Sequence, residues 1–262
     1  MSDLLMLCYH AVSPRWPADL SVTPAALEAQ IGLLAARGYT SARFSDAVAG
    51  HWSNRTVVIT FDDNYRSVAE LAKPILDRYG YVGTVFVPTD WPDRDGPMCW
   101  PGIDRWIGTS HEQEMRSLEW RELRGLQRDG WEIGSHTCSH PQLPEIADTD
   151  LERELTESRA RVEEELGAPC TSLAYPYGGV DARVEEATRA ARYRAACTIP
   201  TILSAPTPLR WPRAPIFQND DLRRFRLKVS APIRKLRATP PGTLLDHTRV
   251  ATVNALRDRR RG

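Results

Sequence analysis

The sequence predicts an α/β protein in which a parallel sheet closes like a barrel. Short runs typical of buried strands alternate with helical segments, and such units recur over about 200 residues. The 262 residues, 42% of them apolar, suffice for one large domain with a sizeable core. In a barrel of this kind, catalytic groups belong at the carboxyl ends of the strands.

The first part of the chain contains the clearest strand and helix signals. Residues 4–9 are continuously apolar and residues 56–61 are rich in β-branched side chains, so both runs predict buried strands. Between them a helix is expected to begin at Thr23-Pro24, a favourable N-cap and first-turn pair, and to stop at Gly38. The next helix and strand are expected at 65–78 and 81–87.

The second part repeats this order after an irregular insertion. Residues 88–117, rich in Pro, Gly and Trp, are too many for a plain connection and are expected to shape a site or a lid. The later helices are expected at 119–129, 148–166 and 181–192, and the later strands at 131–134, 171–175 and 193–198.

The charge of the chain is balanced in total but uneven along its length. The 34 basic and 34 acidic residues cancel, which argues against a uniform attraction to nucleic acid, and no nucleic-acid partner is expected. Residues 222–262 hold twelve basic residues and two acids, so they carry +10 and residues 1–221 carry −10. We expect a catalytic domain over 1–221 and a basic extension over 222–262. The extension is either a solvated tail or a surface for a phosphate-bearing substrate or an anionic membrane.

The location of the protein is expected to be cytoplasmic. The first residues lack the basic and apolar regions of a secretory signal, and no run approaches the roughly 18 apolar residues that span a bilayer. Five scattered cysteines without a C-x-x-C pair suit reduced thiols in a reducing compartment.

Two polar clusters follow predicted strands. Asp62 and Asp63 leave the strand at 56–61 in different directions, so one carboxylate can bind a cation while the other faces a reactant; capping of the next helix is the alternative. His136 and His140 follow a later strand at a spacing that lets both converge on one metal, although a lone histidine is more often structural. With Asp63 they form a two-His, one-carboxylate set of the catalytic type.

A third cluster is the turn Tyr175-Pro176-Tyr177-Gly178, which ends another predicted strand. Such a turn can expose a backbone N–H, with the aromatic rings as a platform for a sugar or another flat ligand. The alternative is an ordinary turn without a binding role.

Together, these clusters resemble the motifs of the polysaccharide deacetylase family, carbohydrate esterase family 4, with its NodB homology domain. The motifs are Thr60-Phe61-Asp62-Asp63, His136-Thr137-Cys138-Ser139-His140 and Tyr175-Pro176-Tyr177-Gly178, and the resemblance covers roughly residues 4–216. It implies a NodB-like, distorted (β/α) barrel of about seven parallel strands.

The resemblance also implies roles for single residues. Asp63, His136 and His140 correspond to metal ligands, Asp62 to the general base, and the Tyr177 backbone N–H to a group that stabilises the oxyanion. Zinc is the expected metal for this donor set, with Co²⁺, Ni²⁺ or Fe²⁺ as alternatives. The residues expected to line the substrate site are Tyr175, Pro176 and Tyr177.

Two features depart from the family's pattern. Ala174 stands where many members carry an Arg that orients the base; Arg213 is the candidate replacement, and a surface role is the alternative. No convincing late Leu-x-His motif supplies the general acid, since His247 lies in the basic extension. Tyr9-His10 instead resembles the Tyr-His of a subgroup whose acid follows the first strand. His10 is therefore the candidate acid, with a structural histidine as the alternative.

The predicted function is metal-dependent hydrolysis of a carbon–nitrogen bond. The expected substrate is the N-acetyl amide of an amino sugar, a short glycan or a glycoconjugate, handled as a cytoplasmic intermediate. The alternatives are a deformylase or an amidohydrolase acting on a non-sugar amide, and an inactive carbohydrate-binding homologue.

Overall fold

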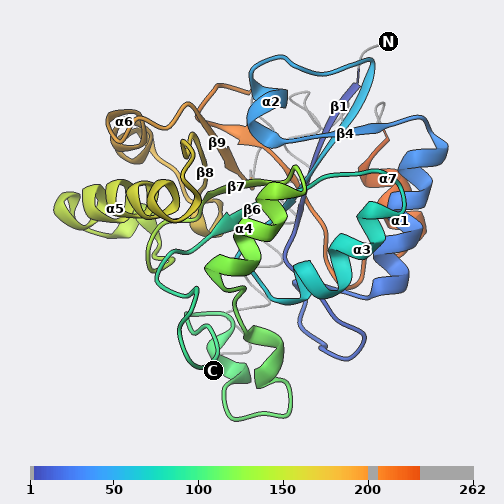
Figure 1. Cartoon of the computed structure of the whole chain (residues 1–262), viewed down its shortest axis with the longest axis horizontal. Helices are drawn as coiled ribbons and strands as arrows, with labels where there is room; N and C mark the ends of the chain where they lie inside the picture. Colours follow the sequence, from blue (N-terminus) through green and yellow to red (C-terminus); the bar gives the residue numbers. More distant parts are fainter. Residues whose placement is uncertain (1–2, 200–205, 231–262) are drawn as a thin grey trace, which may run out of the picture.

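The computed structural model describes residues 3–199 and 206–230, and all pairings between its strands are parallel. The main sheet runs in the order β10-β9-β8-β7-β6-β5-β1-β11 and curls round into a barrel (Figure 1). The predicted barrel of parallel strands is thus confirmed. Its strands are β1 (Asp3–Tyr9), β5 (Arg55–Phe61), β6 (Thr84–Val87), β7 (Glu132–Ser135), β8 (Ser172–Ala174), β9 (Ala195–Thr198), β10 (Trp211–Pro212) and β11 (Ala214–Pro215).

A short segment late in the described chain closes the barrel. β10 pairs with β9, with Trp211 opposite Cys197, and β11 pairs with β1, with Ala214 opposite Leu7. Arg213 lies between these two short strands, where the chain passes from one neighbour to the other. This residue therefore stands at the seam between the first and the last long strands of the sheet.

The barrel is distorted at β5, where two strands share one edge. β4 (Thr40–Ala42) pairs with the first half of β5, and β6 pairs with its second half. The next helix, α2 (Phe44–Val48), lies near the end of the barrel where β1 begins (Figure 1), and Phe44 contacts Phe86 with ring centroids 5.7 Å apart. Phe44 and Phe86 belong to an apolar cluster with Met6, Val58, Ala47, Ala174, Ala195 and Cys197. These side chains form a core that is separate from the main apolar cluster of the protein.

The helices cover the outside of the sheet. α1 (Pro24–Ala36), α3 (Lys73–Asp77) and α7 (Leu222–Lys228) pack on one flank, and α4 (Trp120–Arg128), α5 (Asp148–Leu166) and α6 (Ala182–Ala190) on another (Figure 1). Two of these helices begin at capping residues. At the start of α1, Thr23 Oγ1 accepts a hydrogen bond from the Ala26 N–H at 3.1 Å, and at the start of α4, Glu119 forms a capping box with Glu122.

Several elements differ from the prediction. The helix expected at 65–78 forms only as a π-turn, η1 (Val68–Ala72), followed by α3, because Pro74 has no backbone N–H to continue a regular ladder. The insertion at 88–117 contains two short 3₁₀ turns, η2 (Asp104–Trp106) and η3 (Glu112–Met115). The elements without a prediction are β2 (Ala11–Val12), β3 (Ser21–Val22), β4, α2, β10, β11, α7 and the 3₁₀ turn η4 (Leu143–Glu145), whereas the predicted turn after β8 forms as the 3₁₀ turn η5 (Pro176–Gly178).

The start of the predicted basic extension is visible as α7. Asp221 caps this helix, and Phe225 is fully buried as the helix packs on α1. Residues 231–262, the rest of the extension, lie outside the described residues. Among the helices of the described ranges, none has the length and the apolar character needed to cross a membrane.

We predict that Gly134→Ala destabilises the barrel and that Gly125→Ala does not. A Cβ at Gly134 would lie 2.5 Å from Ser172 Oγ and 2.7 Å from Phe86 Cδ1, whereas a Cβ at Gly125 in α4 meets only Arg128 Nη2, at 3.8 Å. We expect a loss of about 1–3 kcal/mol in unfolding free energy for Gly134→Ala and a gain of up to about 1 kcal/mol for Gly125→Ala. Urea unfolding measures both; equal stabilities for the two variants would contradict the packing described.

Candidate active site

The predicted metal ligands meet at the carboxyl ends of the strands. Asp63 follows β5, His136 follows β7, and His140 ends the loop that His136 begins. Oδ1 of Asp63 lies 3.3 Å from Nε2 of His136 and 3.3 Å from Nε2 of His140, and all three side chains are buried. The structure therefore brings these three residues together as a possible metal site.

The donor atoms of this cluster fit a divalent cation. Nδ1 of His136 lies 2.7 Å from the Ala174 carbonyl oxygen, which can only accept, so Nδ1 carries a proton and Nε2 is the ring atom that faces Asp63. In the part of the chain that the structure describes, Oδ1 of Asp63 has no hydrogen-bond partner, although it is buried between the two imidazoles. A buried, unpaired carboxylate oxygen beside two imidazole nitrogens is what a bound cation would satisfy.

The charges of the cluster favour a cation as well. Burial raises the pKa of Asp63, but His136 and His140 lower it well below its usual range, so Asp63 is a carboxylate. Burial lowers the pKa of His136, and Asp63 and Asp62 more than offset this and raise it. The field of the two carboxylates therefore favours positive charge at His136 Nε2. For His140, burial prevails and lowers the pKa.

Left-handed backbone turns direct the ligands into the site. Five of the seven non-glycine residues with positive φ in the described chain belong to the site's loops: Asp63 (71°), Asn64 (61°), Thr137 (68°), His140 (66°) and Tyr177 (57°). Such conformations cost of the order of 1 kcal/mol or more each and persist only where the surroundings enforce them. Their concentration at the strand ends indicates that the loops are built for a specific side-chain arrangement.

Glu154 on α5 holds the loop between the two histidines, and the sequence analysis missed it. Its buried carboxylate accepts hydrogen bonds from the N–H of Cys138 (2.8 Å), from the N–H of Ser139 (2.9 Å) and from the Ser139 hydroxyl (2.6 Å). A signal was present, because Glu154 lies on the helix face that also carries Leu151, Leu155 and Ser158, where a carboxylate needs a partner.

Arg213 forms a two-point ion pair with Asp62 inside the barrel. Nη1 donates to Asp62 Oδ1 at 2.6 Å and Nη2 donates to Oδ2 at 2.7 Å, and both residues are 2% exposed. Nη1 also donates to Thr60 Oγ1 at 2.7 Å. Burial alone would raise the pKa of Asp62, but Arg213, with His136 and His10 nearby, lowers it to about 2. Arg213 is thus a buried partner of Asp62 and not a surface residue.

His10 lies close to Asp62. Ligand atoms of Cys8, His10 and Asp62 fall within 4.8 Å of one another, and the buried Nδ1 of His10 has no hydrogen-bond partner among the described residues. We do not assign a metal to this group, because Arg213 already engages both oxygens of Asp62 and burial raises the pKa of the Cys8 thiol. The other candidate acid, His247, lies outside the described residues.

The turn after β8 contributes one exposed aromatic residue. Tyr177 is 45% exposed, its ring centroid lies 4.7 Å from that of His140, and its backbone N–H donates no hydrogen bond within the described chain. Tyr175 was expected in the substrate site with Pro176, but both are buried, and the Tyr175 hydroxyl donates to the Leu209 carbonyl at 3.0 Å. Of the predicted platform, only Tyr177 is available to a ligand, because the β8 turn directs Tyr175 into the core.

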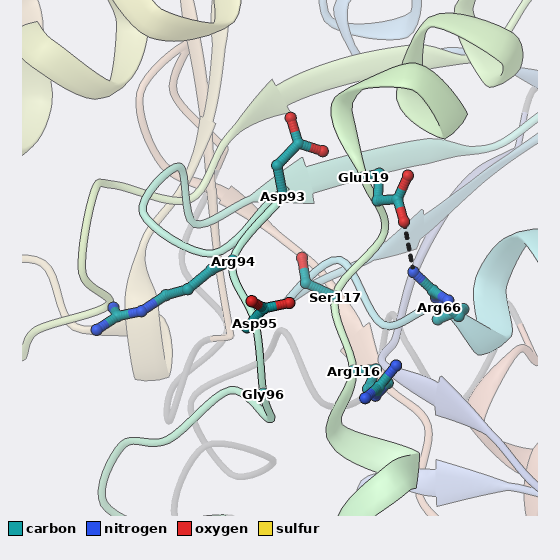
Figure 2. Close-up of a pocket in the computed structure, with 8 residues that line it drawn as sticks. All are labelled: Arg66, Asp93, Arg94, Asp95, Gly96, Arg116, Ser117 and Glu119. Atoms are coloured by element: carbon teal, nitrogen blue, oxygen red, sulfur yellow. Dashed lines mark hydrogen bonds and ion pairs between the residues drawn. The ribbon is translucent and has the colours of Figure 1, made fainter.

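A polar cavity of about 330 Å³ adjoins the loop after β5 (Figure 2). Asn64, next to Asp63, reaches its edge and donates to Ser117 Oγ at 2.8 Å. Arg66 and Glu119 pair on one side of it, with Nη2 donating to Oε1 at 3.2 Å (Figure 2). The cavity is lined by Arg66, Asp93, Arg94, Asp95, Gly96, Arg116, Ser117 and Glu119, so basic and acidic groups balance and give it no preference for an anion.

Known proteins resemble this chain in sequence. Residues 50–196 match the family described as polysaccharide deacetylase. The Bacillus subtilis protein YxkH, whose name describes a polysaccharide deacetylase, is 24% identical over an alignment of 202 residues, and the match covers 75% of this chain and 64% of YxkH. The chain thus matches a little less than two thirds of that relative's length.

Solved structures share the fold. The Streptococcus pyogenes deacetylase PplD, solved in complex with acetate, has a TM-score of 0.72 at 19% identity, covering 87% of this chain and 98% of PplD. The polysaccharide deacetylase BC0361 from Bacillus cereus has a TM-score of 0.71 at 25% identity, covering 87% of this chain and 69% of that one.

We predict strong energetic coupling between Asp62 and Arg213. Arg213→Met leaves a buried carboxylate without its cation and is expected to cost about 3–5 kcal/mol of unfolding free energy. Asp62→Asn in the same chain removes that charge and should recover a large part of the loss. Urea unfolding of the wild type, both single variants and the double variant gives the coupling energy.

The exposed pair Arg43–Asp46 serves as the control for this cycle. Its atoms are also 2.6 Å apart, but the pair is solvent-screened, so its coupling should not exceed about 1 kcal/mol. Additive effects at Asp62 and Arg213 would contradict the ion pair described.

Proposed function

This chain belongs to the polysaccharide deacetylase family, and we propose that it hydrolyses the N-acetyl amide of an amino sugar or short glycan in a metal-dependent reaction. One observation carries the proposal: the donor set of Asp63, His136 and His140 lies beside a second carboxylate, Asp62, that a buried Arg213 engages at both oxygens. Hydrolysis of an amide needs an activated water, a stabilised oxyanion and a proton for the leaving amine, and the residues around this cluster can supply each.

We assign the metal site to Asp63, His136 and His140, with zinc as the expected ion and Co²⁺, Ni²⁺ or Fe²⁺ as alternatives. When bound, such an ion lowers the pKa of water and polarises the amide carbonyl. The hydrogen bond from His136 Nδ1 to the Ala174 carbonyl supports this assignment, because it directs Nε2 to Asp63.

The remaining residues have roles in moving protons and stabilising charge. Asp62 is ionised at neutral pH and accepts a proton from the attacking water, while Arg213 keeps its carboxylate in one orientation. The free N–H of Tyr177 donates to the carbonyl oxygen as negative charge develops there. His10, next to Asp62, gives a proton to the departing amine.

The substrate is proposed to be a cytoplasmic amino-sugar intermediate. The five cysteines are free thiols, which suit a reducing compartment. The exposed ring of Tyr177 offers a surface for a sugar, and the balanced charges of the cavity beside Asn64 suit the hydroxyl groups of a neutral glycan. The basic extension over 222–262 is proposed to contact a phosphate-bearing substrate or an anionic membrane.

We predict that protein supplied with zinc releases acetate from an N-acetylglucosamine oligosaccharide. Asp62→Asn should lower kcat about 10²–10⁴-fold with zinc retained, because only the base is lost. Asp63→Ala should lose the zinc. Acetate assays and elemental analysis check both effects, with the exposed Glu186→Gln on α6 as a control that keeps activity and metal.

The outcomes of this assay also separate the alternatives. A wild-type rate in Asp62→Asn, or a wild-type protein that takes up no zinc, would contradict the proposal. Faster release of formate from the N-formyl analogue would indicate a deformylase.

We predict that His10→Gln strongly slows hydrolysis of the amide but not of an aryl acetate, because the aryl leaving group needs no proton. Equal slowing of both reactions would show that His10 is not the general acid.

We predict salt-sensitive binding of the full chain to vesicles that contain phosphatidylserine. Each basic residue near an anionic surface contributes about 1 kcal/mol, and the exposed Arg223, Arg224 and Arg226 of α7 add to those beyond residue 230. Co-sedimentation at low and high salt measures this. Residues 1–230 alone should bind more weakly yet hydrolyse a soluble substrate normally, and equal binding by both chains would exclude a role for residues 231–262.

A further inference from the structure

The two histidines of the proposed metal site are oriented in different ways. Nδ1 of His136 is hydrogen-bonded to the Ala174 carbonyl, which fixes the plane of that ring. Nδ1 of His140 has no hydrogen-bond partner within residues 3–199 and 206–230, although the residue is only 5% exposed. Metal-binding histidines are normally oriented by a hydrogen bond at the second nitrogen. Another contact must therefore hold the ring of His140 in place.

Aromatic rings take the place of that hydrogen bond. The indole of Trp100 stacks on the imidazole of His140, with centroids 4.4 Å apart and an angle of 26° between the planes. Tyr177 meets the same ring edge-on at 4.7 Å and 64°. Trp100 is 6% exposed and is backed by Trp91, whose ring centroid lies 5.6 Å away. These contacts therefore hold the imidazole of His140 in a single plane.

The backbone around Trp100 is anchored on both sides. Its carbonyl accepts hydrogen bonds from the N–H groups of Ile103 (3.2 Å) and Asp104 (3.1 Å). The carbonyl of Pro101, the next residue, accepts from the Tyr177 hydroxyl at 3.1 Å. On the other side, the Met98 N–H donates to the Met115 carbonyl at 2.8 Å. The position of the indole over His140 is therefore set by the insertion at 88–117 and by the turn after β8.

We propose that Trp100 is a positioning residue of the metal site: it holds the His140 ring so that Nε2 points at the metal position beside Asp63. This inference rests on the metal site of the proposed function and assigns part of the insertion to that site. Without the indole, the ring keeps its edge contacts with Tyr177 and His136 but loses the stacked face that holds its plane, so it can rotate about its bond to Cβ. Nε2 then leaves its place 3.3 Å from Asp63 Oδ1, and metal affinity falls.

The test compares zinc dissociation constants, measured by competition with a chromogenic chelator at a temperature where all proteins are folded. Trp100→Leu keeps apolar bulk without a flat ring and should bind zinc about 10–100-fold more weakly. Trp100→Phe restores a ring and should recover most of the affinity. Trp106→Leu is the matched control, because Trp106 belongs to the same insertion but contacts Trp16 and His111. Its zinc affinity should stay within about threefold of wild type.

A second readout does not depend on activity or on overall stability. The visible absorption of bound Co²⁺ reports the geometry of its ligands, so it should change in Trp100→Leu and stay unchanged in Trp106→Leu. Wild-type affinity and an unchanged spectrum in Trp100→Leu would overturn this inference alone, as would equal losses in both Leu variants. Failure of the wild-type protein to bind zinc would overturn the proposed metal site and this inference with it. If Trp100→Leu does not fold, Trp100→Phe replaces it in the test. This variant should bind zinc between about twofold and tenfold more weakly than the wild type, with a smaller spectral change. Wild-type affinity and an unchanged spectrum in Trp100→Phe would then overturn the inference.

Discussion

The ion pair between Asp62 and Arg213 links the closure of the barrel to its chemistry. Two opposite charges are buried together, and such burial depends on good geometry and on additional hydrogen bonds. The two-point contact and the bond to Thr60 satisfy both terminal nitrogens of Arg213, while its Nε has no partner among the described residues. Arg213 can reach Asp62 because it stands between β10 and β11, where the chain crosses the seam from β9 to β1. One short segment therefore both closes the sheet and fixes the carboxylate at the centre of the site.

Local patterns were sufficient to predict most of the fold. The apolar run at 4–9, the cap at Thr23 and the charged helix at 148–166 carry their signals within a few residues, and these elements form nearly as expected. Pro74 shows where a local pattern misleads, because the apolar period of 65–78 continues through a residue that cannot complete a regular ladder. β10 and β11 were not predicted because two-residue strands exist only through their partners, β9 and β1.

In the candidate site, too, local sequence patterns identify some of the residues and miss others. Asp63, His136 and His140 were identifiable because short motifs at strand ends contain them. The contacts that orient the site are long-range: Glu154 reaches Cys138 from a neighbouring helix, and Arg213 lies 151 residues from Asp62 in the chain. Spacing in the sequence carries no information on such pairs. The position of Tyr175 was missed for a related reason, since a turn motif does not tell which of its two rings faces the core.

The insertion at 88–117 is best understood as a wall of the site. A lid that opens and closes would need few contacts with the residues it covers. Instead, Trp100 stacks on His140, the Pro101 carbonyl accepts a hydrogen bond from Tyr177, and Trp91 backs the stacked indole. Opening this segment would remove support from a proposed metal ligand at the moment when the reaction needs it. Trp100 therefore has a structural role: its flat, rigid side chain can fix the plane of the His140 imidazole, whose Nδ1 has no hydrogen-bond partner among the described residues.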